Sequence, residues 1–287
     1  MKKILVIGGT GMLGYPVAKA LKKHGYEVTI FTRDIKRAQL ITDENFDFQE
    51  GDIFNQQSLI DAMKGKHGIH INLQGGPRLK DYEKTEGQGT LKIVLAAKET
   101  GIKYITLITA ATVDEKNTWF PTIKAKYSAE TYLKSSGIDY TIFRPSWFME
   151  SLPLFVQGKK ASVIGNNPNK YSWIAAEDYA QMVADAYATS TTNHKTIYVY
   201  GPEKYTMKEA LEKYCKVKHP DIKPGVVSAG TLKFIGTISF NPQLKMIAEL
   251  MKYFEKVQEP SFEIPTDIRI FHPQTTLNEW IATVKTA

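Results

Sequence analysis

A short apolar segment near the start of the chain leads directly into a glycine-rich turn and a helical pattern. Residues 3–7, Lys-Ile-Leu-Val-Ile, have the branched apolar character of a strand that is buried on both faces. Residues 8–14, Gly-Gly-Thr-Gly-Met-Leu-Gly, come next, and residues 15–24 carry apolar side chains at helical spacing. In this context glycines allow a tight turn, and backbone N–H groups at the positive end of the helix can bind a pyrophosphate. The pattern predicts a dinucleotide site that includes Gly8, Thr10, Gly11, Met12 and Leu13.

Strand and helix patterns continue to alternate through the first half of the chain. Beyond the first strand, we expect strands at 27–32, 47–50, 68–73, 104–109 and 139–143. The helices between them are expected at 15–24, 55–63, 88–100 and 124–136. Such alternation predicts the α/β class, with a Rossmann-type, doubly wound parallel sheet that helices cover on both faces.

The rhythm changes after Arg144-Pro145, where shorter pieces follow. Strand-like segments occur at 161–164 and 196–200, and helical patterns occur at 177–189, 206–214, 240–257 and from 276 onward. We therefore expect residues 1–150 to form an NAD(P)-binding core and segments within about 160–200 to complete its sheet. Residues 151–287 are then mixed, because they also supply a small α/β substrate lobe.

Composition excludes several classes of protein. The 287 residues are 43% hydrophobic and 23% charged, and no apolar stretch approaches the roughly 20 residues that a membrane helix needs. The apolar run after Lys2-Lys3 stops at Gly8, so we expect no signal peptide. The single cysteine, Cys215, rules out an intramolecular disulfide and suits a reducing compartment. We expect a cytoplasmic protein without a metal site, since no His/Cys cluster has zinc-site spacing.

The net charge of +7 comes from 37 Lys and Arg against 30 Asp and Glu. A basic surface attracts polyanions, such as nucleic acid or a phosphorylated cofactor, but it is also an ordinary way to stay soluble. Here the basic residues are scattered, with no long basic run and no nucleic-acid motif, which favours a solvated surface. We expect a small-molecule substrate, no nucleic-acid or membrane partner, and a monomer or homodimer.

The end of the second expected strand indicates which cofactor fits. NAD sites place an acidic residue there for the ribose 2′-hydroxyl, whereas this strand ends in Arg33, with Lys36 and Arg37 nearby. The planar fork of arginine makes paired, charge-assisted hydrogen bonds to a phosphate, so Arg33 and Arg37 favour NADP(H). Asp34 is the contrary signal, because its carboxylate suits the ribose of NAD. A solvated charged loop is the remaining alternative.

Two later loops are expected to complete the cofactor pocket. Asp52 and Ile53 follow the third strand, where Asp52 either accepts a hydrogen bond from the adenine amino group or caps a helix. Gln74 and Gly75 follow the fourth strand, at the edge where ligands collect in open α/β sheets. A plain turn is the alternative for this second loop.

Together these features resemble the extended and atypical short-chain dehydrogenase/reductases. More narrowly, the chain is similar to the NmrA-like and isoflavone-reductase-like branch, which includes relatives of a complex I accessory subunit. The resemblance covers residues 1–205, is thin after that, and rests on the glycine turn, Arg33, Gly51-Asp52 and segments 126–130, 136–145, 173–178 and 201–203. It implies a Rossmann fold with a small C-terminal substrate lobe, and NADP binding.

The Tyr-x-x-x-Lys pair of the standard members is absent where the family places it, after the fifth strand. Tyr127 stands there, but the residue four positions later is Thr131. Lys126 aligns with the lysine of isoflavone-reductase-like enzymes, which implies that it holds the nicotinamide ribose or acts as a general acid or base. Glu130, one helical turn on, is a candidate partner for Lys126, and a solvated lysine is the further alternative.

Thr109 and the loop after the sixth strand complete the expected site. Relatives carry Ser or Thr at the position of Thr109, whose hydroxyl either meets the substrate or caps the strand. The resemblance implies that backbone near Pro145 and Ser146 contacts the nicotinamide. The apolar residues 147–149 either wall a substrate pocket or belong to the core.

Two functions fit these observations. The first is an NADPH-dependent reductase of a small carbonyl or conjugated double bond, with Lys126 and Thr109 as the catalytic candidates. The second is a non-catalytic NADP(H)-binding redox sensor or assembly factor of the NmrA-like type. The missing Tyr–Lys pair favours the second, whereas Lys126 and the aromatic loop favour the first. The range of activities in the family leads us to expect the reductase.

Overall fold

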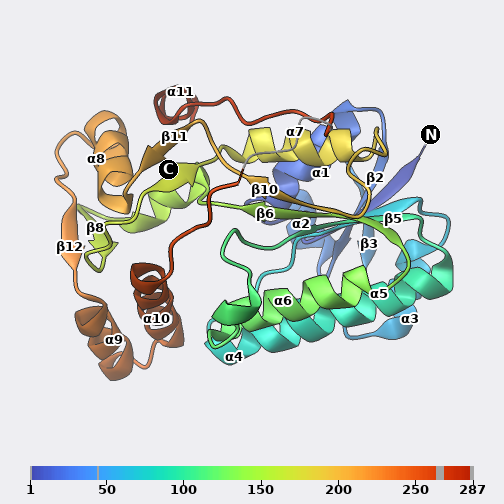
Figure 1. The fold of residues 1–287 in the computed structure, drawn as a ribbon, viewed down its shortest axis with the longest axis horizontal. Coiled ribbons are helices and arrows are strands. Elements are labelled where there is room, and N and C mark those ends of the chain that lie inside the picture. The colour runs from blue at the N-terminus through green and yellow to red at the C-terminus, as the bar shows by residue number, and fades with distance from the viewer. Residues whose placement is uncertain (1, 44, 263–267, 285–287) are drawn as a thin grey trace.

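The computed structural model describes residues 2–43, 45–262 and 268–284 of the chain. Within these residues, the central sheet has seven parallel strands in the order β10-β6-β5-β4-β1-β2-β3 (Figure 1). This is the strand order of the doubly wound dinucleotide-binding fold with one strand added, so the expected α/β class is confirmed. The strands are β1 (Lys3–Ile7), β2 (Glu27–Thr32), β3 (Asp47–Glu50), β4 (Gly68–Ile71), β5 (Tyr104–Ile108), β6 (Asp139–Pro145) and β10 (Lys195–Val199).

Helices cover both faces of this sheet (Figure 1). One layer contains α1 (Gly14–Lys23) and α7 (Ala176–Ala186), which pack against each other. The opposite layer contains α3 (Gln56–Met63), α5 (Gly89–Thr100) and α6 (Pro121–Lys134). Strand β1 lies between two apolar clusters, with alternate residues in each, which explains why its sequence is apolar throughout and not alternating.

A smaller lobe lies at one end of the sheet (Figure 1). A separate apolar cluster around Tyr171, Trp173 and Tyr214 forms its core. Trp173 Nε1 donates a hydrogen bond to the carbonyl oxygen of Tyr205 at 3.0 Å, which satisfies the buried indole and joins two strands of the lobe. The elements of the lobe are η3 (Met149–Phe155), β7 (Val156–Gln157), β8 (Lys160–Ile164), β9 (Tyr171–Trp173), β11 (Glu203–Tyr205), α8 (Met207–Lys218), β12 (Gly225–Val227), α9 (Ala229–Ile238), α10 (Pro242–Lys256) and α11 (Leu277–Thr283).

The structure contains elements that the sequence patterns did not predict. Helix α2 (Ile35–Ile41) follows β2, and α9 precedes the expected helix that appears as α10. The helix expected at 88–100 is the last part of a longer run, in which α4 (Leu79–Tyr82), the π-helix η1 (Glu83–Gln88) and α5 follow one another without a break. In the described part of the chain, no helix is both long and apolar enough to cross a bilayer.

Candidate functional site

The glycine turn between β1 and α1 is closed so tightly that it excludes side chains. Gly8 has a φ of +83°, and a Cβ there would lie 2.0 Å from the carbonyl oxygen of Asn72. A Cβ on Gly14 would lie 2.1 Å from the carbonyl oxygen of Gly8. Leu13 is the N-cap of α1 and makes no side-chain cap, and the first turn of the helix has no acidic residue. The turn fits an anion such as a pyrophosphate, and the exposed or partly exposed residues on it are Gly8, Thr10, Gly11, Met12 and Leu13.

Arg33 and Arg37 are both exposed beyond the end of β2, the strand that pairs with β1. Asp34 is the N-cap of α2, and its Oδ1 accepts a hydrogen bond from the backbone N–H of Arg37 at 2.9 Å. Helix capping therefore explains Asp34 without an NAD ribose. Because β1 and β2 are parallel, the segment that holds Arg33 and Arg37 begins at the same edge of the sheet as the glycine turn, and guanidinium chemistry suits a 2′-phosphate.

The loop after β3 holds Asp52 in a turn of its own. Asp52 Oδ1 accepts a hydrogen bond from the backbone N–H of Phe54 at 2.9 Å, and Ser58 Oγ donates to the Asp52 carbonyl oxygen at 2.9 Å. Asn55, and not Asp52, is the N-cap of α3. Ile53 is partly buried against the apolar cluster beneath α3 and α5. Asp52 thus has a structural task in the loop, and a contact with adenine remains a prediction.

A buried glutamate joins the loop after β4 to Lys126. The backbone N–H of Gly75, next to the exposed Gln74, donates to Glu86 Oε1 at 2.9 Å. Lys126 Nζ lies 2.7 Å from Glu86 Oε2, and the two side chains are 19% and 6% exposed. Burial and the Glu86 carboxylate together raise the pKa of neighbouring Tyr82 to about 12. Burying such a charged pair costs desolvation energy, and buried charged groups of this kind are common at functional sites.

Lys126, Glu86 and Thr109 line one small cavity of about 10 Å³. It lies where β4 and β5 end against α5 and α6, and its remaining wall is mostly apolar. A space of this size holds about one water molecule. The structure therefore brings together the two residues expected to be catalytic, at the edge of the sheet where ligands bind in such folds.

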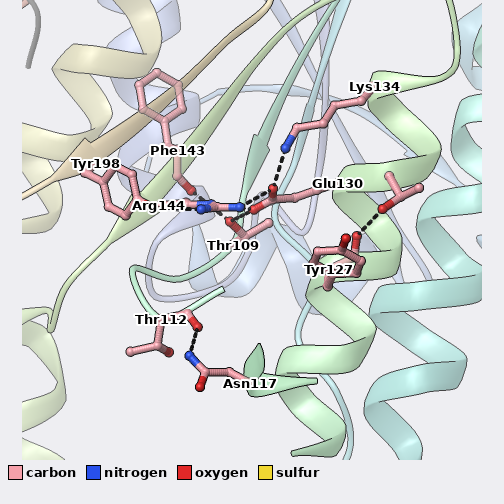
Figure 2. Close-up of polar contacts among 10 residues, drawn as sticks. Thr109, Thr112, Asn117, Tyr127, Glu130, Lys134, Phe143, Arg144 and Tyr198 are labelled. Carbon is pink, nitrogen blue, oxygen red and sulfur yellow. Dashed lines mark hydrogen bonds and ion pairs between the residues drawn. The ribbon is translucent and has the colours of Figure 1, made fainter. Parts of the chain in front are cut away.

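Glu130 organises a second buried network beside the first, as Figure 2 shows. Its carboxylate accepts hydrogen bonds from Arg144 Nε at 2.8 Å and Nη2 at 2.7 Å, and from Thr109 Oγ1 at 2.9 Å. Lys134 Nζ lies 3.0 Å from Glu130 Oε2, and Arg144 Nη1 donates to the Tyr198 hydroxyl at 2.8 Å. The paired Arg144 contacts fix the end of β6, from which the loop at Pro145 and Ser146 emerges.

The expected pairing of Glu130 with Lys126 is wrong. Glu130 faces the strand-borne Arg144 and Thr109, whereas Lys126 reaches the π-helix and pairs with Glu86. The spacing of four residues on one helix predicted a local pair, but Glu130 makes that pair with Lys134 and its other contacts with Arg144 and Thr109. The hydroxyl of Thr109 is likewise used by Glu130 in this structure.

The loop after β6 connects the core to the lobe. Pro145 ends β6, and its carbonyl oxygen accepts a hydrogen bond from the backbone N–H of Ala111 at 2.9 Å. The N–H of Ser146 donates to the carbonyl oxygen of Val199 at 3.0 Å, and its Oγ donates to Glu259 Oε2 at 2.6 Å. Backbone and side chain of this loop are thus fixed by neighbours on both sides, and contact with a nicotinamide remains a prediction.

Aromatic side chains gather where this loop meets α10. The rings of Trp147 and Phe254 are 5.1 Å apart, and Phe120 at the start of α6 stacks on Tyr253 at 4.4 Å. Phe148 and Met149, the other two residues of the expected wall, are buried in the apolar clusters of the core and the lobe. The aromatic wall next to the strand ends is therefore formed largely by α10, which the sequence patterns did not connect to the site.

Two residues of the candidate site, Glu86 and Glu259, were not predicted from the sequence. A signal for Glu86 was present, because it lies on the helical stripe of Tyr82, Thr90 and Ile93, where a charge is unexpected. Glu259 had no such signal, since its partner Ser146 is 113 positions away in the sequence. Among the described residues, no three His, Cys, Asp or Glu side chains are grouped so that they could hold a metal ion.

Comparisons with known proteins agree with this geometry. A family model described as NAD(P)H-binding matches residues 8–190. Photosystem II assembly factor Ycf39 of Guillardia theta is 25% identical over 215 residues, which cover 73% of this chain and 68% of the relative. Triphenylmethane reductase of Citrobacter sp., solved with NADP(H), superposes with a TM-score of 0.77 at 19% identity, covering 97% of this chain and 99% of that one.

A structure of pinoresinol-lariciresinol and phenylcoumaran benzylic ether reductases, described in relation to isoflavone reductases, gives a TM-score of 0.68 at 18% identity, with 98% of this chain and 99% of the other covered. The resemblance to the isoflavone-reductase-like branch is thereby confirmed at the level of the fold. The family model begins at the glycine turn and spans five of the seven strands of the central sheet, β2 to β6, so the match covers most of the core. The chain belongs to the NAD(P)H-binding family.

Proposed function

We propose that the protein is an NADPH-dependent reductase of a small, largely apolar acceptor with a carbonyl or conjugated double bond. The observation that carries this proposal is the convergence of three features on one edge of the parallel sheet. These are the closed glycine turn with its uncapped helix, the buried Lys126–Glu86 pair, and the aromatic wall next to the loop at Ser146. In open α/β sheets this edge is where a dinucleotide and its substrate bind.

The residues present fit NADPH well. The Gly8–Gly14 turn and the N-terminus of α1 would bind the pyrophosphate, and Arg33 and Arg37 would bind the 2′-phosphate. Lys126 would lie near the nicotinamide ribose, where its ammonium group can donate hydrogen bonds to hydroxyls. When bound, NADPH supplies the hydride, while the chain orients the acceptor, excludes water and handles the remaining proton.

The acceptor is expected to be flat and apolar. Trp147 and Phe254 are partly exposed and offer ring surface to an aromatic or quinone-like molecule, whereas Phe120 and Tyr253 are buried, stack on each other and support them from behind. A structurally similar protein is named as a triphenylmethane reductase and is connected with triphenylmethane dyes, which are large aromatic molecules.

One observation favours the alternative of a non-catalytic sensor or assembly factor. Lys126 and Thr109 are both held in place by buried glutamates, as is expected of residues that position a dinucleotide without reacting. A relative at 25% identity is named as an assembly factor, which supports the second alternative. Both functions require the dinucleotide, so they differ in turnover and not in binding.

Turnover separates the two functions directly. The protein is incubated with NADPH and a panel of quinones, triphenylmethane dyes, enals and aromatic ketones, and the loss of NADPH absorbance is followed. We expect oxidation with at least one flat aromatic acceptor and none with small aliphatic ones. Tight NADPH binding with no oxidation across the panel would contradict the reductase and leave the sensor.

A further inference from the structure

Residues 257–262, which follow α10, cross the ends of two neighbouring strands, β6 and β10 (Figure 1). They are joined to the residues that follow those strands. Glu259 Oε2 accepts a hydrogen bond from Ser146 Oγ at 2.6 Å, one residue beyond β6. The carbonyl oxygen of Pro260 accepts a hydrogen bond from the hydroxyl of Tyr200, one residue beyond β10. Glu259 is thereby held at the binding edge of the sheet, next to the loop that is expected to meet the nicotinamide.

Glu259 lies in a cluster of polar groups from several elements. Burial raises the pKa of its carboxyl to about 7, although the Ser146 hydrogen bond and the charge of Lys204 on β11 act in the opposite direction. The other titratable groups that face it are Tyr171 on β9 and Tyr200. Burial raises the pKa of both phenols, so they are neutral near pH 7. Glu259 is therefore the member of this cluster that exchanges a proton near neutrality.

The two residues that sequence reasoning offered as catalytic are already engaged. The ammonium group of Lys126 contacts the Glu86 carboxylate, and the Thr109 hydroxyl donates to Glu130. Transfer of a hydride to a carbonyl or conjugated acceptor leaves negative charge on the acceptor oxygen, which needs one proton. A general acid for that step has to lie near the nicotinamide loop and carry a proton that it can release.

We propose that Glu259 is the catalytic acid of the reductase proposed above, and that it contacts the acceptor oxygen beside Ser146. This inference rests on the proposed function, because it assigns the proton of the same reaction. The O–H bond of the Glu259 carboxyl breaks as a new O–H bond forms on the reduced acceptor. The Glu259 carboxylate accepts the Ser146 hydrogen bond during this change and then takes a proton from water, so the charges balance over the cycle.

The Glu259→Gln variant tests this assignment. Glutamine keeps an oxygen that can accept the Ser146 hydrogen bond but has no proton to give, so the segment stays in place while the acid is removed. We expect kcat to fall about 100-fold or more, with the dissociation constant for NADPH unchanged. The matched control is Glu255→Gln, which removes an exposed carboxylate from the end of α10 and is expected to leave kcat unchanged.

The pH profile distinguishes proton transfer from a merely structural role. In the parent protein kcat should fall as the pH rises through about 7, because Glu259 loses its proton there, whereas the residual rate of Glu259→Gln should lose this dependence. Infrared titration without any acceptor provides a readout that is independent of turnover. The parent should lose the protonated-carboxyl bands of both Glu259 and Glu150 near pH 7, whereas the variant should lose only that of Glu150.

The possible failures are distinguishable. An active parent whose kcat and pH profile survive in Glu259→Gln would overturn the assignment of the acid and leave the reductase standing. A parent that binds NADPH and reduces no acceptor would overturn the reductase, and the assigned proton step with it. Infrared spectra in which the two proteins titrate identically would also contradict the role of Glu259.

Discussion

Two buried glutamates contact the basic side chains at this edge of the sheet. The Glu86 carboxylate pairs with Lys126 and accepts a hydrogen bond from the backbone N–H of Gly75. The Glu130 carboxylate pairs with Arg144 and Lys134 and accepts a hydrogen bond from the Thr109 hydroxyl (Figure 2). Each carboxylate therefore accepts several hydrogen bonds, which offsets the cost of its burial. Lys126 is consequently a fixed group at the edge of the sheet, better suited to orienting a ligand than to swinging toward one.

Arg33 should decide the preference between the two nicotinamide cofactors. Its guanidinium lies exposed beyond β2, and Asp34 beside it is occupied in capping α2. We expect Arg33→Ala to weaken NADPH binding about 10-fold or more, since a hydrogen bond to a charged group contributes about 1.5–3 kcal/mol. NADH binding should hardly change, and fluorescence titration measures both constants. Lys98→Ala, an exposed lysine on α5, is the control, and equal affinities of the parent for both cofactors would contradict the prediction.

The sequence was informative about residues whose task depends on their near neighbours. The glycines of the turn were recognisable because each one serves a local strand–turn–helix unit. Lys126 was recognisable through the resemblance to isoflavone-reductase-like enzymes. Glu259 could not be recognised from the sequence, because its contact with Ser146 exists only in the folded protein. A local sequence pattern does not predict such a tertiary contact.

At the scale of elements, the helices that sequence patterns missed are those with weak local signals. Helix α9 contains two glycines and several β-branched residues, so its intrinsic helix propensity is low. Ser228 caps it and α10 packs along it, which supplies the missing stability. Helix α2 was not predicted because its basic residues were interpreted as part of a cofactor-binding loop. Asp34 is a typical N-cap residue and could have indicated the start of this helix. The strongly patterned β1 and α1 were located closely.

The contact of α1 with the glycine turn should be intolerant of a single methyl group. A Cβ on Gly14 would lie 2.1 Å from a backbone oxygen, which cannot move without displacing the turn. We expect Gly14→Ala to lower the free energy of unfolding by about 1–3 kcal/mol and to weaken NADPH binding strongly, as urea unfolding and titration would show.

Gly230→Ala on α9 is the matched control for that change. A Cβ there would meet only Ser228 Oγ, at the ordinary distance of 3.7 Å. Because alanine favours helix over glycine, this variant should be as stable as the parent or more so, by up to about 1 kcal/mol. Equal stability of Gly14→Ala and the parent would show that the turn is not closed as described.

At the scale of the whole molecule, Glu150 connects the core and the lobe through hydrogen bonds to both. Its Oε1 accepts hydrogen bonds from the backbone N–H of Ala176 in α7 at 3.0 Å and from Trp280 Nε1 in α11 at 2.8 Å. Its Oε2 is buried without a hydrogen-bond partner among the described residues. Burial therefore raises the pKa of Glu150 from the ordinary value of 4.5 to about 7.

This raised pKa makes stability depend on pH with a definite sign. Between pH 4.5 and about 7 the folded protein holds a proton that the unfolded chain has lost, so this contribution is full below pH 4.5 and is lost as the pH rises through about 7. Glu150→Gln should thus resemble the parent near pH 5 and be more stable near pH 8, by up to about 3 kcal/mol. Urea unfolding at both values measures this, with the exposed Glu212→Gln as control. A variant less stable than the parent near pH 8 would contradict it.

The route of the chain through the two parts of the molecule has a consequence for how the protein is made. All seven strands of the sheet have been synthesised once Val199 has left the ribosome, and the glycine turn has been present since the first residues. The contact between Ser146 and Glu259 has to wait for a further stretch of chain. Because N-terminal parts fold first during synthesis, the nascent protein can acquire its nucleotide pocket well before it acquires the acid that we assign to it.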